Sequence, residues 1–367
     1  MATRLFWTLY RLSGMRICWL TLIVASLALH PATAQRIEHF SRIDIPLTKR
    51  SAQFGNNEIF AEWLNDVEIV SYTRDWRLAR VDVSTKEKKW SRKWLDGVSD
   101  FSVCASQMRI ALICKSDLLK ETKVVLVHTT DGSSILSTDS RKLSELADTQ
   151  FFLPTQIAIH PKNGSVLISN FSTHFGDNAY LFNNKLDRID RRIGVDSMPG
   201  EISFTENADR LTILADFDVL NIRDISKNSD IYFAGKRYKK PRTSITSVVD
   251  APFFSNAYHD GENMLVYSRD NSWATGRIFV HELDKKTKNE FDGLNGHIVM
   301  DVDFANKRIA ASGTSKDISL FDFNGNKLAE LTNATGKRNF NLRFSPDGKK
   351  LLICNSNAIW IFAIKPE

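Results

Sequence analysis

Short apolar stretches of strand length recur along most of this chain, and many of them lead into the same kind of turn. The clearest copy is Phe-Ser-Pro-Asp-Gly-Lys-Lys-Leu at residues 344–351, where one strand enters a turn and a second strand leaves it. Proline presets the first turn dihedral, and Asp-Gly supplies the positive φ that a tight hairpin requires. Weaker copies stand at residues 157–164 and 202–209. Strand-length runs joined by a recurring turn predict an all-β chain of repeated antiparallel units.

The best-preserved unit spans residues 294–331. It contains, in order, a Gly-His opening, a Ser-Gly pair after the second strand, an Asp in the next turn and an aromatic–Asp pair at the end of the third strand. This order resembles a WD repeat, and the turn at residues 344–351 resembles that of WD-like and TolB-like propellers. The residues that carry the resemblance, and for which it implies structural roles in the repeat, are His297, Ser312, Asp317, Phe321, Asp322, Pro346, Asp347 and Gly348.

The resemblance also implies a hydrogen-bond network inside this unit. His297 is expected to bond the carboxylate of Asp317, and Ser312 with the third-strand aromatic is expected to link the outer strands to the inner ones. Phe321 stands where a WD repeat has tryptophan. Because the phenylalanine side chain lacks the indole N–H of tryptophan, we expect that network to be one donor short.

Applying the same pattern along the chain divides it into seven units, each expected to form one four-stranded blade of a β-propeller. The last unit ends after its third strand, at residues 359–364, and a spare strand at residues 38–47 precedes the first unit. This arrangement predicts a ring that the N-terminal strand closes, which leaves no exposed sheet edge. The boundaries near residues 50, 145 and 245 are weakly marked, so six and eight blades stay as alternatives. The seven units span residues 51–97, 98–140, 150–193, 199–236, 244–293, 294–334 and 337–365.

The N-terminus has the three parts of a secretory signal peptide. A basic segment without acidic residues precedes an apolar run at residues 17–29, and the small-residue sequence Ala-Thr-Ala follows at residues 32–34. The run is shorter than the roughly 20 apolar residues that span a bilayer. We therefore expect a signal peptide at residues 1–34, cleavage before Gln35 and a β-propeller domain at residues 35–367. The mature protein is expected in the periplasm or secreted, without a transmembrane segment.

Charge and cysteine content narrow the classes of partner. The formal net charge of +6 includes three arginines of the expected signal peptide, so the mature chain is only mildly cationic and carries no nucleic-acid signature. Three cysteines remain after cleavage, namely Cys104, Cys114 and Cys354. An odd number leaves at least one thiol unpaired, and large repeat cores do not need disulfides. We expect the three to be small buried apolar side chains.

No strong catalytic signature is present, whether a phosphate-binding loop, a nucleophile elbow or the paired histidines of a zinc site. The sequence therefore assigns no catalytic, cofactor-binding or metal-ligating residue. One basic connector without an acidic residue joins the fourth and fifth units, and it is suited to an anionic polymer, a lipid headgroup or an acidic protein surface. A solvated linker is the alternative. Its candidate binding residues are Lys236, Arg237, Tyr238, Lys239, Lys240 and Arg242.

Two classes of function follow from these observations. The favoured hypothesis is a non-enzymatic exported propeller that binds another exported protein or a ligand. The alternative is a propeller enzyme, a lactonase, a hydrolase or a quinoprotein, with an active site in the central channel. The residues of such a site would come from several blades, and their spacing in the sequence would not reveal them. Metal and cofactor analysis of the purified protein separates the two.

Overall fold

The structure is a computed structural model. It describes residues 35–44, 59–73, 77–94, 97–115, 121–171, 176–195, 199–205, 207–215, 219–234, 253–271, 275–292, 294, 298–314, 316–336, 339–355 and 357–366. The basic connector at residues 236–242 and His297 lie outside these residues.

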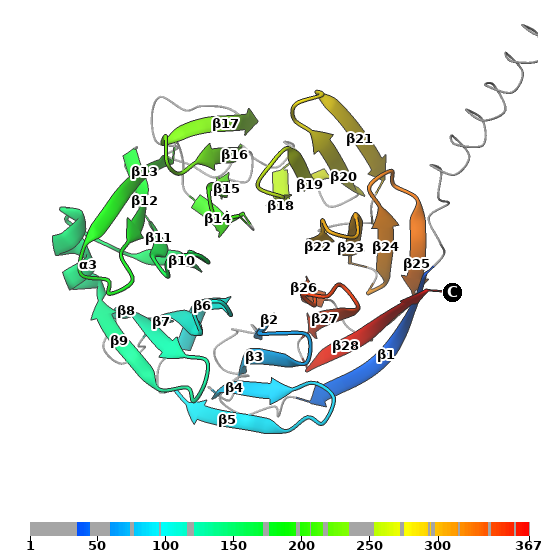
Figure 1. The fold of residues 1–367 in the computed structure, drawn as a ribbon, viewed down its shortest axis with the longest axis horizontal. Coiled ribbons are helices and arrows are strands. Elements are labelled where there is room, and N and C mark those ends of the chain that lie inside the picture. The colour runs from blue at the N-terminus through cyan, green and yellow to red at the C-terminus, as the bar shows by residue number, and fades with distance from the viewer. Residues whose placement is uncertain are drawn as a thin grey trace, which may run out of the picture.

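The described residues form seven four-stranded antiparallel sheets arranged in a ring around a central opening (Figure 1). In each of the first six blades the first strand lies nearest the axis and the fourth lies at the rim, and the chain then passes to the next blade. Each predicted unit contains one blade, apart from strand ends that run a residue or two further. The seven-bladed β-propeller is thus confirmed, and the alternatives of six and eight blades are excluded.

The first four blades carry sixteen strands. Blade 1 contains β2 (Phe60–Trp63), β3 (Glu68–Thr73), β4 (Arg77–Asp82) and β5 (Lys88–Lys93), and blade 2 contains β6 (Gly97–Cys104), β7 (Arg109–Lys115), β8 (Thr122–His128) and β9 (Ser134–Asp139). Blade 3 contains β10 (Pro154–Ile159), β11 (Val166–Asn170), β12 (Gly176–Phe182) and β13 (Ile189–Val195). Blade 4 contains β14 (Pro199–Phe204), β15 (Arg210–Ala215), β16 (Val219–Asp224) and β17 (Ser229–Ala234).

The remaining three blades include the strand that comes from the N-terminus. Blade 5 contains β18 (Phe253–His259), β19 (Met264–Asn271), β20 (Thr275–Glu282) and β21 (Thr287–Asp292). Blade 6 contains β22 (Val299–Asp303), β23 (Arg308–Ser312), β24 (Ile318–Asp322) and β25 (Lys327–Leu331). Blade 7 contains β26 (Asn339–Phe344), β27 (Lys350–Asn355), β28 (Ala358–Pro366) and, as its fourth strand, β1 (Gln35–Asp44).

The core lies between neighbouring blades rather than inside any one of them. Val70 of blade 1 packs in one cluster with Ile110 and Leu112 of blade 2, and all three side chains are fully buried. The second strand of each blade is covered by a neighbouring blade on each of its two faces, which explains why its sequence is mostly apolar. The outermost strands β5 and β21 are largely exposed and carry mostly polar residues.

Ring closure follows the predicted route. Strand β1 pairs antiparallel with β28, from Gln35 opposite Pro366 to Asp44 opposite Ala358, and so becomes the outer strand of blade 7 (Figure 1). Ile37 points into the cluster that also contains Phe362. The predicted spare strand is therefore confirmed as the closing strand, although it begins and ends three residues earlier than residues 38–47.

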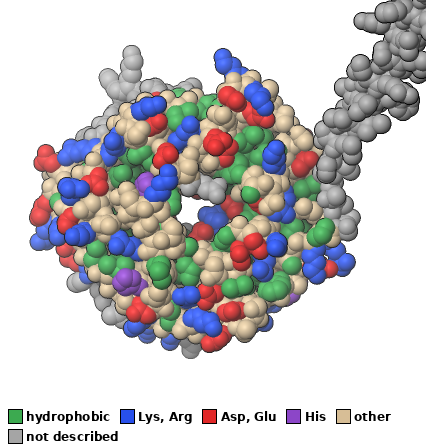
Figure 2. Space-filling model, in the orientation of Figure 1, with side chains coloured by type: hydrophobic (Ala, Val, Ile, Leu, Met, Phe, Trp, Pro, Cys, Tyr) green, Lys and Arg blue, Asp and Glu red, His purple; other side chains and the backbone are tan. Residues whose placement is uncertain are grey.

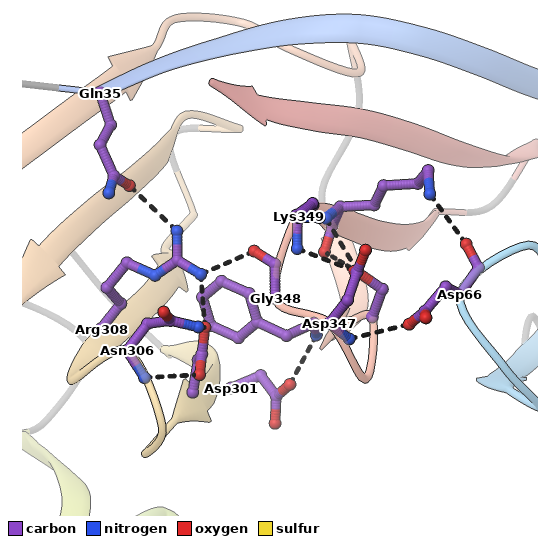
Figure 3. Close-up of polar contacts among 12 residues, drawn as sticks. Gln35, Asp66, Asp301, Asn306, Arg308, Asp347, Gly348 and Lys349 are labelled. Atoms are coloured by element: carbon purple, nitrogen blue, oxygen red, sulfur yellow. Dashed lines mark hydrogen bonds and ion pairs between the residues drawn. The ribbon is translucent and has the colours of Figure 1, made fainter. Parts of the chain in front are cut away.

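Polar contacts between the turns that join first and second strands connect blades 6, 7 and 1 (Figure 3). The backbone N–H of Asp347 donates to Oδ1 of Asp66 at 2.8 Å, and the carbonyl of Gly348 accepts from Nη2 of Arg308 at 2.6 Å. Gly348 has a φ of +66°, as the Asp-Gly sequence predicts, and a Cβ there would collide with Asp303 and Arg308. A glycine at this turn therefore allows both the hairpin and the close approach of blade 6.

One short helix, α3 (Ser140–Ala147), stands between blades 2 and 3 at the rim (Figure 1). It was not anticipated, because only Leu143 and Ala147 of its eight residues are buried, too few to give a helical period in the sequence. The side chain of Asp139 caps its N-terminus by accepting from the N–H of Lys142 at 2.8 Å. Within the described ranges, no helix combines the length and the hydropathy needed to cross a membrane.

The three cysteines expected in the mature chain are all free and buried. Cys104 pairs with Arg109 and Cys114 pairs with Val98 across the β6–β7 hairpin, so the two thiols are out of register. Their expected role as buried apolar side chains is confirmed.

The role of β1 in the core can be tested with two substitutions on that strand. Ile37→Ala is expected to lower the free energy of unfolding by about 2–4 kcal/mol, because Ile37 is buried in the apolar cluster between blades 6 and 7. Phe40→Ala serves as the matched control and is expected to cost less than about 1 kcal/mol, since Phe40 is 43% exposed. Urea denaturation followed by fluorescence measures both values. Equal losses would contradict the packing of β1 through its Ile37 face.

Candidate functional site in the central channel

Ionisable and phenolic side chains from five innermost strands converge on the central channel. Figure 2 shows charged side chains of both signs on the wall of the opening. Glu62 and Glu201 come from blades 1 and 4, which are not neighbours, and they nevertheless interact electrostatically. These side chains therefore approach one another across the channel instead of lying along a single blade. The members of the set are Glu62 of β2, Glu201 of β14, Tyr258 of β18, Asp301 of β22 and Arg343 of β26, together called the channel cluster.

Arg343 is the centre of the channel cluster. Its Nε donates to both carboxylate oxygens of Glu62, at 3.0 and 3.3 Å, and its Nη1 donates to the hydroxyl of Tyr258 at 3.3 Å. The Tyr258 hydroxyl in turn donates to the carbonyl of Met300 at 2.7 Å. The two partners of the ion pair are partly buried, with 29% of the Arg343 side chain and 26% of the Glu62 side chain exposed. Partial burial strengthens such a pair relative to one at the surface.

The other two carboxyl groups have less compensation. Burial raises the pKa of Asp301 to about 7, although Arg343 and the N–H of Phe344, which donates to Oδ2 at 2.7 Å, act in the opposite direction. Burial likewise raises the pKa of Glu201, with Arg343 again acting in the opposite direction. None of the described residues donates a hydrogen bond to the Glu201 carboxyl. Three carboxyl groups thus share one guanidinium, which cannot neutralise all of them. The raised pKa values of Asp301 and Glu201 mean that these two groups hold their protons to a higher pH than usual.

This arrangement can do two kinds of chemistry. A carboxyl group with a pKa near 7 is suited to accept and donate protons at neutral pH. A surplus of carboxyl groups also attracts a cationic ligand group, because such a group would relieve the repulsion among them. Burial also raises the pKa of the Tyr258 phenol, so that it remains a hydrogen-bond donor. Among the described residues, no three His, Cys, Asp or Glu side chains are grouped as metal ligands would be.

Similar positions in other blades show which part of the cluster is structural. Asp100 accepts from the N–H of Ile157 at 2.6 Å, and Gln156 accepts from the N–H of Ile202 at 3.3 Å. Each contact joins one innermost strand to the next, as the contact from Phe344 to Asp301 does. The inter-blade bond made by Asp301 is therefore a recurring feature of the ring, whereas its raised pKa comes from its burial, with a smaller contribution from Glu62.

Part of the predicted repeat set lies in blade 6, and its members are not brought into the channel cluster. Ser312 is buried and its hydroxyl accepts from the Asn339 amide at 2.7 Å. Oδ1 of Asp317 accepts from the N–H of Asn333 at 2.7 Å. Because His297 lies outside the described residues, its expected bond to Asp317 stays a prediction.

The other predicted repeat residues have local structural contacts. Phe321 is buried and packs against Phe291 of blade 5, with 5.4 Å between the two ring centroids. Asp322 accepts from two backbone N–H groups of the following turn. Oδ1 of Asp347 accepts from the Ser345 hydroxyl at 2.6 Å, across the exposed Pro346, and Gly348 makes the contact to blade 6 described above.

Comparison with known proteins was informative only for the fold. No protein-family model matches the chain, and no curated protein matches its sequence. Among solved structures, the β-propeller domain of Cps50 (Swd1) from Myceliophteria thermophila is similar, with a TM-score of 0.59 and 14% identity over 83% of this chain and 95% of that chain. The chain thus has a WD-repeat-like β-propeller fold, in agreement with the resemblance of residues 294–351 to such repeats.

The raised pKa of Asp301 predicts a specific pH dependence of stability. The folded state holds the Asp301 proton more tightly than the unfolded chain, with a pKa of about 7 against the reference value of 3.8, so stability falls as the pH rises through this window. Asp301→Asn keeps an acceptor for the Phe344 N–H and removes the titration. At pH 8 this variant is expected to be more stable than the unmodified protein by on the order of 4 kcal/mol. At pH 4 the difference is expected to vanish.

Urea denaturation at pH 4, 6 and 8 measures this difference. The matched control is Asp303→Asn, two residues along the same strand, which would leave the buried Arg308 without its ion pair. This control is expected to lose stability at pH 8. A constant difference between Asp301→Asn and the unmodified protein at all three pH values would contradict the assignment.

Proposed function

We propose that this chain is an exported, rigid propeller module that binds another exported protein. The observation that carries the proposal is an exposed apolar ridge on blade 3. Propellers of the WD-repeat-like kind generally bind other proteins, and the fold is compatible with that role. The ridge consists of Phe151, Leu153 and Phe171, whose side chains are 75%, 42% and 42% exposed.

The ridge is held in place by its own hydrogen bonds. The buried Asn170 accepts from the N–H of Leu153 at 2.7 Å and donates to the carbonyl of Phe151 at 3.4 Å. The N–H of Phe171 donates to the carbonyl of Leu153 at 2.9 Å. The segment with Phe151 and Leu153 comes just before β10, and Phe171 comes just after β11, so both lie at the same end of these two paired strands. The large apolar side chains therefore stand on a fixed backbone, which reduces the conformational entropy lost on binding.

The size and chemistry of the ridge fit the centre of a protein interface. Its three side chains expose on the order of 300 Å² of mostly aromatic surface. A stable interface between two proteins buries about 800 Å² per partner, with a few aromatic residues contributing most of the affinity. The ridge is thus too small to hold a second copy of the chain by itself. It fits a partner that offers a matching apolar side chain at the centre and polar contacts around it.

Export is the second part of the proposal. The sequence predicts a cleavage site before Gln35, and Gln35 is also the first described residue of the closing strand β1. Cleavage at this position would remove the leader and leave every described residue of the closing strand. We propose the periplasm, or the outside of the cell, as the location of the mature protein.

A second contact is proposed at the basic connector between blades 4 and 5, with an acidic partner surface or an anionic polymer. The candidate residues are Lys236, Arg237, Tyr238, Lys239, Lys240 and Arg242. The support for this part is the run of positive charge without an acidic residue. The connector would add a salt-dependent attraction to the apolar contact at the ridge.

The role of the ridge is tested by removing its aromatic side chains. Phe151→Ser combined with Phe171→Ser is expected to weaken partner binding at least about tenfold, because each residue would act as a hot spot. Stability should change little, since both side chains are exposed. Quantitative affinity capture from the exported fraction of the source cells, followed by measurement with the purified partner, provides the readout. Met108→Ser is the matched control, because Met108 is 50% exposed on a different turn. Equal binding by the ridge variant would contradict the proposal.

A second candidate function is a hydrolase or lactonase with its active site in the channel. The specific observation in its favour is Asp301, whose pKa of about 7 suits proton transfer at neutral pH and which interacts with Tyr258 and Arg343. Under this candidate, Asp301→Asn is expected to remove turnover of a panel of esters and lactones. Asp100→Asn, which alters a carboxyl with the same inter-blade bond, should keep that turnover. No turnover of any substrate in the panel by the unmodified protein would contradict this candidate.

A further inference from the structure

The side chain of Gln35 is held by an arginine of a different blade. Gln35 is the first residue of β1 and lies opposite Pro366 of β28. Its Oε1 accepts a hydrogen bond from Nη1 of Arg308 at 3.2 Å (Figure 3). Arg308 belongs to β23 of blade 6, 273 positions further along the chain. This contact thus depends on the closed ring.

Arg308 is rigidly positioned for this contact. Its side chain is only 9% exposed, and its Nη2 pairs with Asp303 and donates to the carbonyl of Gly348. Asp303 is fixed in turn by the Asn306 amide, which donates to Oδ2 at 2.8 Å. The other terminal guanidinium nitrogen, Nη1, therefore has a defined direction toward Gln35. A positive charge held in this way polarises the Gln35 amide carbonyl.

Gln35 also borders a cavity of about 530 Å³ between blades 5 and 6. Arg308, Asn306 and Lys307 lie on its wall together with apolar groups such as Phe323. The cavity leaves room for the Gln35 side chain to change conformation. It also offers a small leaving molecule a path away from the amide.

We propose that Gln35, once exposed as the N-terminal residue, cyclises in place to pyroglutamate, with Arg308 assisting the reaction. This inference rests on the proposed cleavage before Gln35. The neutral α-amino nitrogen attacks Cδ of the side-chain amide and forms the N–Cδ bond. Negative charge develops on Oε1, where Nη1 of Arg308 stabilises it. The bond from Cδ to Nε2 then breaks, Nε2 takes the proton given up by the amine, and ammonia leaves. No oxidant or other co-reactant is needed.

The product suits its place in the fold. Cyclisation removes the α-ammonium charge from the residue whose side chain contacts the Arg308 guanidinium, and like charges in proximity are unfavourable. It also removes the free amine that aminopeptidases require. The closing strand of the ring would thereby be protected at the end from which trimming would begin.

The reaction can be timed in a fusion protein from which a site-specific protease exposes Gln35 at time zero. Intact-mass spectrometry then follows the loss of one ammonia. The folded chain is expected to cyclise at least about tenfold faster than the same chain in urea, because one oxyanion donor is typically worth 10²–10³ in rate. Equal rates in the folded and denatured chains would overturn the proposal without reference to any variant.

Two substitutions locate the effect. Arg308→Lys keeps a positive charge for Asp303 but lacks the second nitrogen that reaches Gln35, and it is expected to lower the rate toward that of the denatured chain. Arg109→Lys is the control, because Arg109 makes a similar bond, to the carbonyl of Asn184 at 3.0 Å, far from Gln35. Thermal melting confirms that both variants fold. A folded Arg308→Lys protein that cyclises at the unmodified rate would overturn the role of Arg308.

The protein isolated from its source distinguishes this inference from the proposed export. A mature chain that begins at Gln35 and lacks one ammonia supports both. A chain that begins at unmodified Gln35 supports the cleavage and overturns the modification alone. A chain that begins at any other residue overturns the cleavage before Gln35 and, with it, the modification.

Discussion

The pairing of β1 with β28 is the contact on which the rest of this structure depends. Every blade buries its apolar faces against two neighbours, so a break at any junction would expose two faces and a sheet edge at once. The junction between blades 7 and 1 must be made by distant parts of the chain. Besides the closing strand, it is held by the Trp63 indole, which donates to the carbonyl of Arg343 at 3.1 Å, and by the Asn341 amide, which donates to the carbonyl of Ala61 at 3.1 Å.

Closure also creates the sites. Glu62 and Arg343 are 281 positions apart in the sequence and become an ion pair only because blade 7 docks against blade 1. The contact of Gln35 with Arg308 spans 273 positions and has the same origin. In both cases a side chain contributed by one end of the chain meets a residue of the last two blades. Loss of closure is therefore expected to affect the channel and the N-terminus together, while the ridge on blade 3 rests on hydrogen bonds within that blade.

The parts of the structure that could be predicted are those encoded locally. The Pro-Asp-Gly turn at residues 346–348 specifies a positive φ within three residues, and weaker copies of this turn between strand-length runs predicted seven units, with six and eight as alternatives. The spare strand at the N-terminus showed how the ring closes. The channel cluster was missed because each blade supplies at most one of its members. A signal was present, since Glu201 and Arg343 are ionisable residues within short predicted first strands, but such a residue is also common at a solvated edge. Only the ring geometry places them together.

Asp301 shows how a structural position and a chemical one can coincide. The ring needs only an acceptor for the backbone N–H of the next innermost strand, and in blade 3 the neutral amide of Gln156 supplies it. An amide at position 301 would make the same bond without a buried ionisable group. The carboxyl instead lowers stability at neutral pH, since its pKa is raised to about 7 by burial. Ring architecture therefore accounts for the hydrogen bond of Asp301 but not for its acidity. The raised pKa follows from burial of this carboxyl group within the channel cluster, where Asp301, Glu201 and Glu62 interact with one guanidinium.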